Sequence, residues 1–144
     1  MQPELLLFDI GNTSIKIGLA HERQVVTSYT LRTDAEQTAD DLGLQLTSLL
    51  GHAGVAAQSL QACVASSVVP GFDPLLREAV VRYVDCPLYR AGGDLPVPLE
   101  NRYERPAEVG ADRLVGAYAA RRLYPEAPGL LVVDFGTAVT IDCV

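Results

Sequence analysis

Two segments of the sequence place an aspartate and a glycine at the end of an apolar run. LLLFDIGNTSIKIGL begins at residue 5, and LLVVDFGTAVTIDCV begins at residue 130. In each, four apolar residues lead to Asp9 or Asp134, then to an apolar residue, a glycine, a small polar residue and an alternating strand. The two aspartates are 125 positions apart, and we interpret the segments as one structural unit used twice.

The residue types at these two turns suit the binding of phosphate. Gly11 and Gly136 let the backbone turn so that N–H groups face an anion, while Asn12, Thr13 and Thr137 add short side-chain donors. Two such hairpins facing each other would bind a polyphosphate from both sides, with the carboxylates holding a hydrated Mg²⁺. An ordinary Asp-Gly strand turn explains either segment alone, whereas the pair favours a nucleotide clamp. The sequence has neither GxxxxGK[ST] nor GxGxxG.

Two more groups are candidates for chemistry. Lys16, the single lysine, is expected on the polar face of the strand after the first turn. It is either an ordinary solvated side chain or a cation that binds phosphate. Gly110, Asp112 and Arg113 fall in the first turns of a predicted helix, where a glycine costs about 1 kcal/mol but lets a ligand approach. An Asp-Arg pair suits a base beside an anion-binding cation, although an aspartate near a helix N-terminus is favourable in itself.

The hydrophobic patterns predict the elements that position these groups. Strands are expected at 4–10, from residue 14, and at 25–31, which makes an antiparallel meander. A helix from about residue 38 to Gly51 or Gly54, a strand at 60–69 and a helix capped by Asp73 through residue 83 follow. A short strand and a loop fill 86–106, a long helix spans 106–124, and strands at 130–136 and 138–144 end the chain. This order predicts a mixed α/β sheet.

Composition narrows the classes of function. The chain has 144 residues, 49% apolar and 20% charged, which fits one ordinary globular domain. A net charge of −7 argues against a general nucleic-acid or anionic-membrane surface. The three cysteines are far apart and without metal-ligand spacing, so we expect reduced, mostly buried thiols and no zinc site. The apolar run at 5–8 is too short for a signal peptide or membrane span.

Four segments together resemble the type III pantothenate kinases, a family of the actin-like ATPase superfamily. DIGNTSIKIGL resembles the first phosphate motif of the family, SSVVPGF its middle strand and turn, NRYERPAEVGADRL its pantothenate-site segment, and DFGTAVTID its second phosphate motif. The resemblance covers nearly the whole chain in the family's order. It implies an α/β lobe of the ribonuclease H-like, actin-like ATPase kind, with helices on both faces of the sheet.

The resemblance also implies a reaction and its cofactors. ATP would phosphorylate pantothenate to 4′-phosphopantothenate, the first step of coenzyme A synthesis, with Mg²⁺ and a monovalent cation, potassium or ammonium. The implied phosphate-binding residues are Asp9, Gly11, Asn12, Thr13, Lys16, Gly136 and Thr137. Asp112 would be the general base, and Tyr103, Gly110 and Arg113 would line the pantothenate site. Asp134 would help to hold the monovalent cation, and Asp9 would hold Mg²⁺, directly or through water.

The length of the chain bears on this interpretation. Members of the family are roughly twice as long, in keeping with the repeat spacing. We expect residues 1–128 to form a first lobe and 129–144 the opening hairpin of a second lobe, whose remainder is absent. The complete protein would be a cytoplasmic homodimer. Two alternatives stay open, namely another actin-like small-molecule kinase or phosphatase, and an accessory or binding protein without catalysis.

Overall fold

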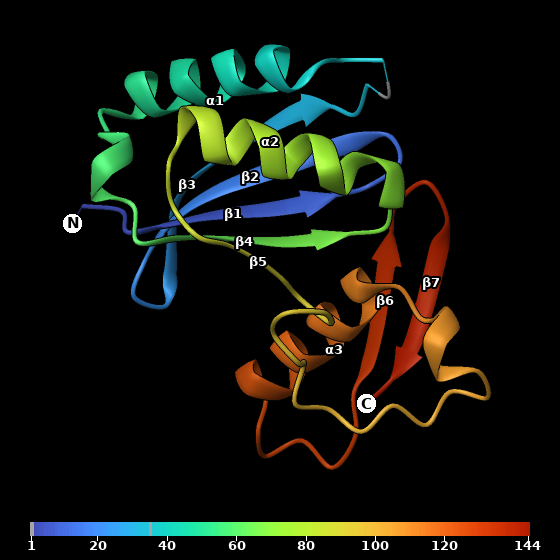
Figure 1. Cartoon of the computed structure of the whole chain (residues 1–144). Coiled ribbons are helices and arrows are strands. Elements are labelled where there is room, and N and C mark those ends of the chain that lie inside the picture. The colour runs from blue at the N-terminus through green and yellow to red at the C-terminus, as the bar shows by residue number, and fades with distance from the viewer. Residues whose placement is uncertain (1, 35) are drawn as a thin grey trace.

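The computed structural model describes residues 2–34 and 36–144. Strands β1 (Leu5–Ile10), β2 (Ser14–His21) and β3 (Gln24–Arg32) form the antiparallel meander. Strand β4 (Ala62–Ser67) lies parallel to β1, and β5 (Leu88–Arg90) lies parallel to β4. The sheet order is β3-β2-β1-β4-β5 (Figure 1), so the prediction of a mixed sheet that opens with a meander is confirmed.

Helix α1 (Ala39–Ala53) begins and ends where the sequence indicates. The Thr38 hydroxyl accepts a hydrogen bond from the Asp41 backbone N–H at 3.1 Å, and the Asp41 carboxylate accepts one from the Thr38 N–H at 2.9 Å. This reciprocal capping box satisfies N–H groups that the first turn leaves unpaired. Gly54 ends the helix at φ 68°, a left-handed conformation that glycine adopts without strain.

Helices α1 and α2 (Asp73–Tyr83) pack on the same face of the sheet (Figure 1). Each presents an apolar stripe to alternate residues of the strands, which is the expected pattern for a two-layer core. The largest fully buried side chains of this core are Leu6, Ile10, Ile15, Ile17, Leu19, Leu42, Leu46, Cys63 and Val80. The rigid ends of β1 and β2 are therefore fixed by packing from one side.

The opposite face of the sheet is less covered than the sequence suggests. Helix α3 (Ala111–Leu123) lies outside the α1–α2 layer and touches this sheet at β4. Asp9 and Lys16 are exposed on this face. Among the described residues, helices thus cover most of one face and the other only near β4, where two covered faces were expected.

Two predicted helix starts differ from the structure. Asp73 is the first residue of α2 and not its cap, because a 3₁₀ turn at Pro70–Phe72 leads directly into the helix. Its carboxylate instead lies 2.5 Å from Arg90 Nη1. The helix predicted at 106–124 starts later than expected: a 3₁₀ turn at Pro106–Glu108 and two extended residues, 109 and 110, precede α3. None of the helices in 2–34 and 36–144 has the length and apolarity of a membrane span.

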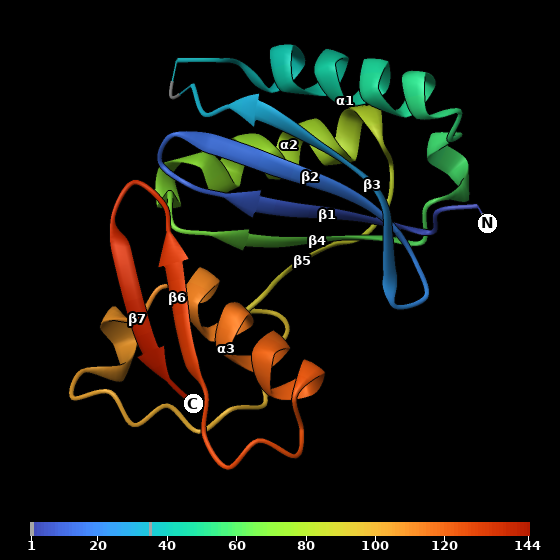
Figure 2. The same ribbon diagram turned by 180° about the vertical axis from the view of Figure 1, so that it is seen from behind.

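Strands β6 (Leu131–Phe135) and β7 (Val139–Cys143) form a separate two-stranded sheet, which matches the predicted hairpin. The two ends of this hairpin lie in different surroundings: its turn lies beside the end of β1 and β2, and its base lies beside α3 (Figure 2). The face turned away from α3 bears apolar side chains that are largely exposed, with Phe135 at 80%. An isolated two-stranded hairpin is marginally stable, so α3 is an important support for it.

Two thiols that are distant in sequence meet in the fold. Cys63 Sγ in β4 lies 3.3 Å from Cys86 Sγ, just before β5. Cys63 is fully buried, and this burial raises the pKa of its thiol, with the neighbouring Cys86 contributing in the same direction. Cys143 on β7 is exposed, so the expectation of mostly buried thiols is correct for Cys63, half correct for Cys86 and wrong for Cys143.

We therefore expect the three thiols to react in order of exposure. Iodoacetamide should modify Cys143 first, Cys86 more slowly and Cys63 only when the protein unfolds, because the thiolate is the reactive form and Cys63 is neither exposed nor readily ionised. Peptide mass spectrometry at successive times, with and without denaturant, measures the order. Equal rates for Cys63 and Cys143 in the folded protein would contradict the buried environment of β4.

Candidate functional site

The first candidate phosphate turn is tied down by a residue after β3. The Gly11 N–H donates to the Ser14 carbonyl at 3.0 Å and closes the turn. Thr33 binds it from the side, since its hydroxyl donates to the Gly11 carbonyl at 2.7 Å and its N–H donates to the Thr13 carbonyl at 3.1 Å. Thr33 was not among the predicted site residues, and nothing in its local sequence indicates this role.

Asp9 and Lys16 face each other across the hairpin that ends in this turn. They are direct partners in the β1–β2 register, and Lys16 Nζ lies 3.5 Å from Asp9 Oδ2. The two side chains are 50% and 67% exposed, respectively. An ion pair this open to water adds little stability, so both groups are available to a ligand.

The second candidate turn is similar to the first but one residue shorter. Asp134 is paired with Thr140 in the β6–β7 register, and the Gly136 N–H donates to the Ala138 carbonyl at 3.0 Å. Thr140 therefore stands where the first hairpin has Lys16. The two turns are not equivalent, because the second offers an aspartate and hydroxyls but no cation.

The two turns touch. Thr13 Oγ1 lies 2.9 Å from Thr137 Oγ1, within hydrogen-bond distance although the residues are 124 positions apart. The fold thus places the turns of the two repeated segments next to each other, although they are far apart in the sequence. Asn12 forms the exposed tip of the first turn beside this contact. No group of three or more His, Cys, Asp or Glu side chains suited to a metal occurs within 2–34 and 36–144.

Gly110 is the N-cap of α3 and lies outside the helix. The helix-interior cost expected for this glycine therefore does not apply. A close approach explains it instead: a Cβ here would lie 2.5 Å from Asp112 Oδ1 and 3.2 Å from Val68 Cγ1. Val68 in turn donates its N–H to the Ile10 carbonyl at 3.1 Å. The start of α3 is thus next to the end of β1, where the first turn begins.

Asp112 lies in the first turn of α3 and is half-buried. Its Oδ1 accepts a hydrogen bond from the Arg113 backbone N–H at 2.8 Å. This contact fixes one carboxylate oxygen against the helix N-terminus, where a negative charge is favourable. The second oxygen, Oδ2, makes no hydrogen bond to any of the described residues.

Arg113 is held by a residue that the sequence did not reveal. Its Nε lies 3.1 Å from both carboxylate oxygens of Asp142, and its Nη2 contacts Asp142 Oδ1 as well. The hydrogen bond with Asp142 raises the pKa of Arg113. The guanidinium also lies over the Tyr103 ring, with Cζ 5.4 Å from its centroid. The only signal for Asp142 in the sequence is a charged residue within a short strand of otherwise uncharged residues.

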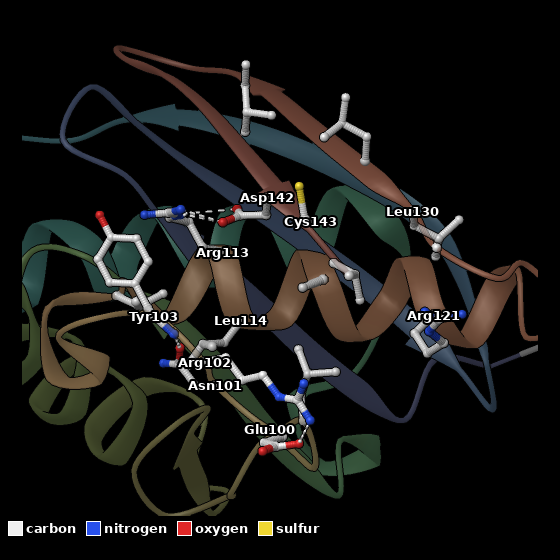
Figure 3. A pocket seen from close by; sticks show the side chains of 17 residues that line it. Glu100, Asn101, Arg102, Tyr103, Arg113, Leu114, Arg121, Leu130, Asp142 and Cys143 are labelled. Carbon is white, nitrogen blue, oxygen red and sulfur yellow. Dashed lines mark hydrogen bonds and ion pairs between the residues drawn. The ribbon is translucent and has the colours of Figure 1, made fainter.

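Tyr103, Arg113 and Asp142 line a pocket between α3, residues 99–103 and the β6–β7 hairpin (Figure 3). Its volume is about 1040 Å³, and it is open to solvent. Arg102, Arg113 and Arg121 line it, together with the acidic Glu100 and Asp142. This excess of one positive charge suits an organic molecule with a single negative charge.

The fold and the paired turns define the class of protein: the sheet is an actin-like ATPase lobe of the kind found in sugar kinases. A structure from Porphyromonas gingivalis, described as that of a candidate N-acetylglucosamine kinase, has this fold, with a TM-score of 0.53 at 20% identity over 96% of this chain and 44% of its own. The model of the family described as type III pantothenate kinase matches residues 5–144. The chain belongs to the type III pantothenate kinase family.

Relatives in this family are similar along the whole chain. The protein named type III pantothenate kinase of Desulfovibrio desulfuricans is 92% identical, and that of Nitratidesulfovibrio vulgaris is 62% identical, both over 144 residues. In each case the match covers 100% of this chain and 55% of the relative. The chain therefore spans about half the length of the curated relatives it matches.

Proposed function

We propose that the protein transfers a phosphoryl group from ATP to pantothenate and gives 4′-phosphopantothenate, the first step of coenzyme A synthesis. The observation that supports this most is the contact between Thr13 and Thr137 in a chain of this family, since it makes two phosphate-type turns adjacent. We further propose that residues 1–128 are a first lobe and residues 129–144 open a second. A cytoplasmic homodimer is the proposed assembly.

The first turn would bind the ATP phosphates. Phosphoryl transfer depends mainly on positioning and on neutralising charge, and Lys16 is a cation next to Asp9 at the first turn. Gly11 and Gly136 would let the two turns approach the phosphates closely, and the hydroxyls of Thr13 and Thr137 would surround them, with Asn12 at the tip. The second turn has the uncharged Thr140 opposite its aspartate, where the first turn has Lys16. Of the two turns, only the first would therefore supply a positive charge to the phosphates.

The carboxylates fit the metal ions of the proposed reaction. Mg²⁺ prefers oxygen ligands, keeps several waters and is often bound by one or two carboxylates together with substrate phosphates. Asp9 has this chemistry and is exposed at the turn. Asp134 would contribute to a site for potassium or ammonium. When bound, the ions would neutralise charge on the phosphates.

Asp112 would be the general base that removes the proton from the pantothenate hydroxyl. Its free carboxylate oxygen and its place at the start of α3, next to the end of β1, support this role. Tyr103, Gly110 and Arg113 would bind pantothenate. Gly110 matters because a side chain there would displace Asp112.

A coupled assay of ADP release with ATP, pantothenate, Mg²⁺ and potassium tests the proposal. The Desulfovibrio desulfuricans relative serves as a full-length reference in the same assay, and light scattering gives the mass of each species. The proposal fails if a folded protein extended to the length of that relative shows no pantothenate-dependent ADP release. Release with a different acceptor from a panel of hydroxyl compounds would identify another actin-like kinase, and ATP binding without turnover would identify an accessory protein.

Replacing Lys16 tests the asymmetry of the two turns. Lys16→Met should raise the KM for ATP about tenfold and leave the KM for pantothenate within twofold, because the lost charge-assisted hydrogen bonds go to phosphate. Initial rates at varied ATP and varied pantothenate give both constants. Arg23→Met, at the exposed β2–β3 turn, is the matched loss of a cation. An unchanged KM for ATP would place the phosphates away from the first turn.

A further inference from the structure

The contact between Asp142 and Arg113 joins the second hairpin to the proposed pantothenate site. We infer that Asp142 is a positioning residue: it fixes the guanidinium of Arg113 so that the edge nearer Tyr103 receives the carboxylate of the acceptor. The inference rests on the proposed function for the identity of the acceptor. No catalytic role for Asp142 itself is implied.

The geometry of the guanidinium separates its two edges. Asp142 takes the edge formed by Nε and Nη2, a bidentate arrangement with defined orientation (Figure 3). The guanidinium carbon Cζ lies 5.4 Å from the centroid of the Tyr103 ring, and both residues line the pocket. A planar guanidinium offers five N–H donors, so an occupied edge leaves donors for a second carboxylate. Asp142 and an anionic acceptor can therefore bind Arg113 together.

Burial explains why the pair is rigid. The side chains of Arg113 and Asp142 are only 22% and 21% exposed, unlike Lys16 and Asp9 at the turn. A half-buried charge without its partner is costly, so each group is stabilised in place by the other. Without Asp142, the long Arg113 side chain would turn towards water and lose its alignment over Tyr103.

The repeat indicates that the position of Asp142 is specialised. In the strand register, Asp142 is opposite Val132, and the matching pair of the first hairpin is Gly18 opposite Leu7. The first hairpin has no side chain at this place, whereas the second has a carboxylate aimed at α3. The carboxylate is therefore present only in the hairpin that lines the pocket.

Calorimetry with two ligands tests the inference without phosphoryl transfer. The probes are pantothenate and its neutral primary amide, added to the wild type, Asp142→Asn and Asp142→Glu. Wild type should prefer the acid, Asp142→Asn should bind the acid about tenfold more weakly with less than twofold change for the amide, and Asp142→Glu should recover part of the loss. Asp40→Asn removes a carboxylate paired with Arg82, far from the pocket, and should change neither affinity.

A spectroscopic readout separates positioning from simple stabilisation. The Nε–Hε NMR signal of Arg113, assigned from its loss in Arg113→Lys, should shift when wild type binds the acid and should stay unshifted with the amide. Equal wild-type affinity for acid and amide, or tighter acid binding by Asp142→Asn, would overturn the inference, the latter by showing that Asp142 competes with the acceptor. Retained acid preference with no ADP release would leave the inference standing and remove the proposed kinase function.

Discussion

Asp112→Asn should lower the pantothenate-dependent turnover number by at least about 100-fold, the usual contribution of a general base. The amide keeps the shape of the carboxylate and can still accept the Arg113 N–H at the start of α3, so the helix should be undisturbed. It cannot accept a proton from the acceptor hydroxyl. Single-turnover measurements of ADP formation, with circular dichroism to verify the fold, give the comparison.

Two controls limit the interpretation of this result. Asp40→Asn should retain full turnover, because Asp40 interacts with Arg82 and Tyr83 on the other side of the sheet. ATP affinity of Asp112→Asn should remain within about twofold, since the proposed phosphate contacts are at the turns. Turnover at the wild-type level would show that Asp112 is not the base and that the acceptor hydroxyl lies elsewhere.

Gly43→Ala should destabilise the protein, although alanine is the better helix former. Gly43 is buried in α1, and a Cβ there would lie 2.0 Å from Cδ2 and 2.4 Å from Cγ of the Tyr83 ring. The ring cannot withdraw freely, because its hydroxyl donates to Asp40 Oδ1 at 2.7 Å. Overpacking typically costs about 1–3 kcal/mol, and a midpoint of thermal unfolding lowered by roughly 5 °C is expected.

Gly51→Ala in the same helix is the matched control. A Cβ at Gly51 meets no atom within 4 Å, so only the helix propensity changes. The unfolding midpoint should rise by a few degrees, in line with about 0.5–1 kcal/mol gained. Differential scanning calorimetry of both variants gives two shifts of opposite sign. A stabilising Gly43→Ala would mean that α1 and α2 are not in close contact at Tyr83.

The elements with strong local signals were predicted well. The meander, the approximate bounds of α1 and the final hairpin follow from alternation, helical periodicity and turn residues, all of which act between near neighbours. The helix predicted at 106–124 is present as α3, but it starts five residues later than expected. Pro106 favours a helix start, but residues 109 and 110 are extended, and Gly110 lies against Val68, which is about 40 positions away in the sequence.

Residue spacing in the sequence also failed to predict contacts between residues that the fold brings together. Cys63 and Cys86 show no motif in sequence, yet their sulfur atoms lie 3.3 Å apart because β4 and β5 are neighbours. Asp142 shows no motif with Arg113 either, because the two residues are 29 positions apart and lie on different elements. The turn of the second hairpin is one residue shorter, so the strand positions after it are displaced by one.

The sequence by itself determined the repeated Asp-x-Gly turns, the lobe that positions the first of them, and the residues that correspond to the family's motifs. Periodicity and turn chemistry are local properties, which the order of residues specifies directly. Only the tertiary structure decided that Thr13 meets Thr137 and that Arg113 is held by Asp142. These contacts join residues 124 and 29 positions apart, and they form only when the packing of the sheet and α3 sets the place of both hairpins.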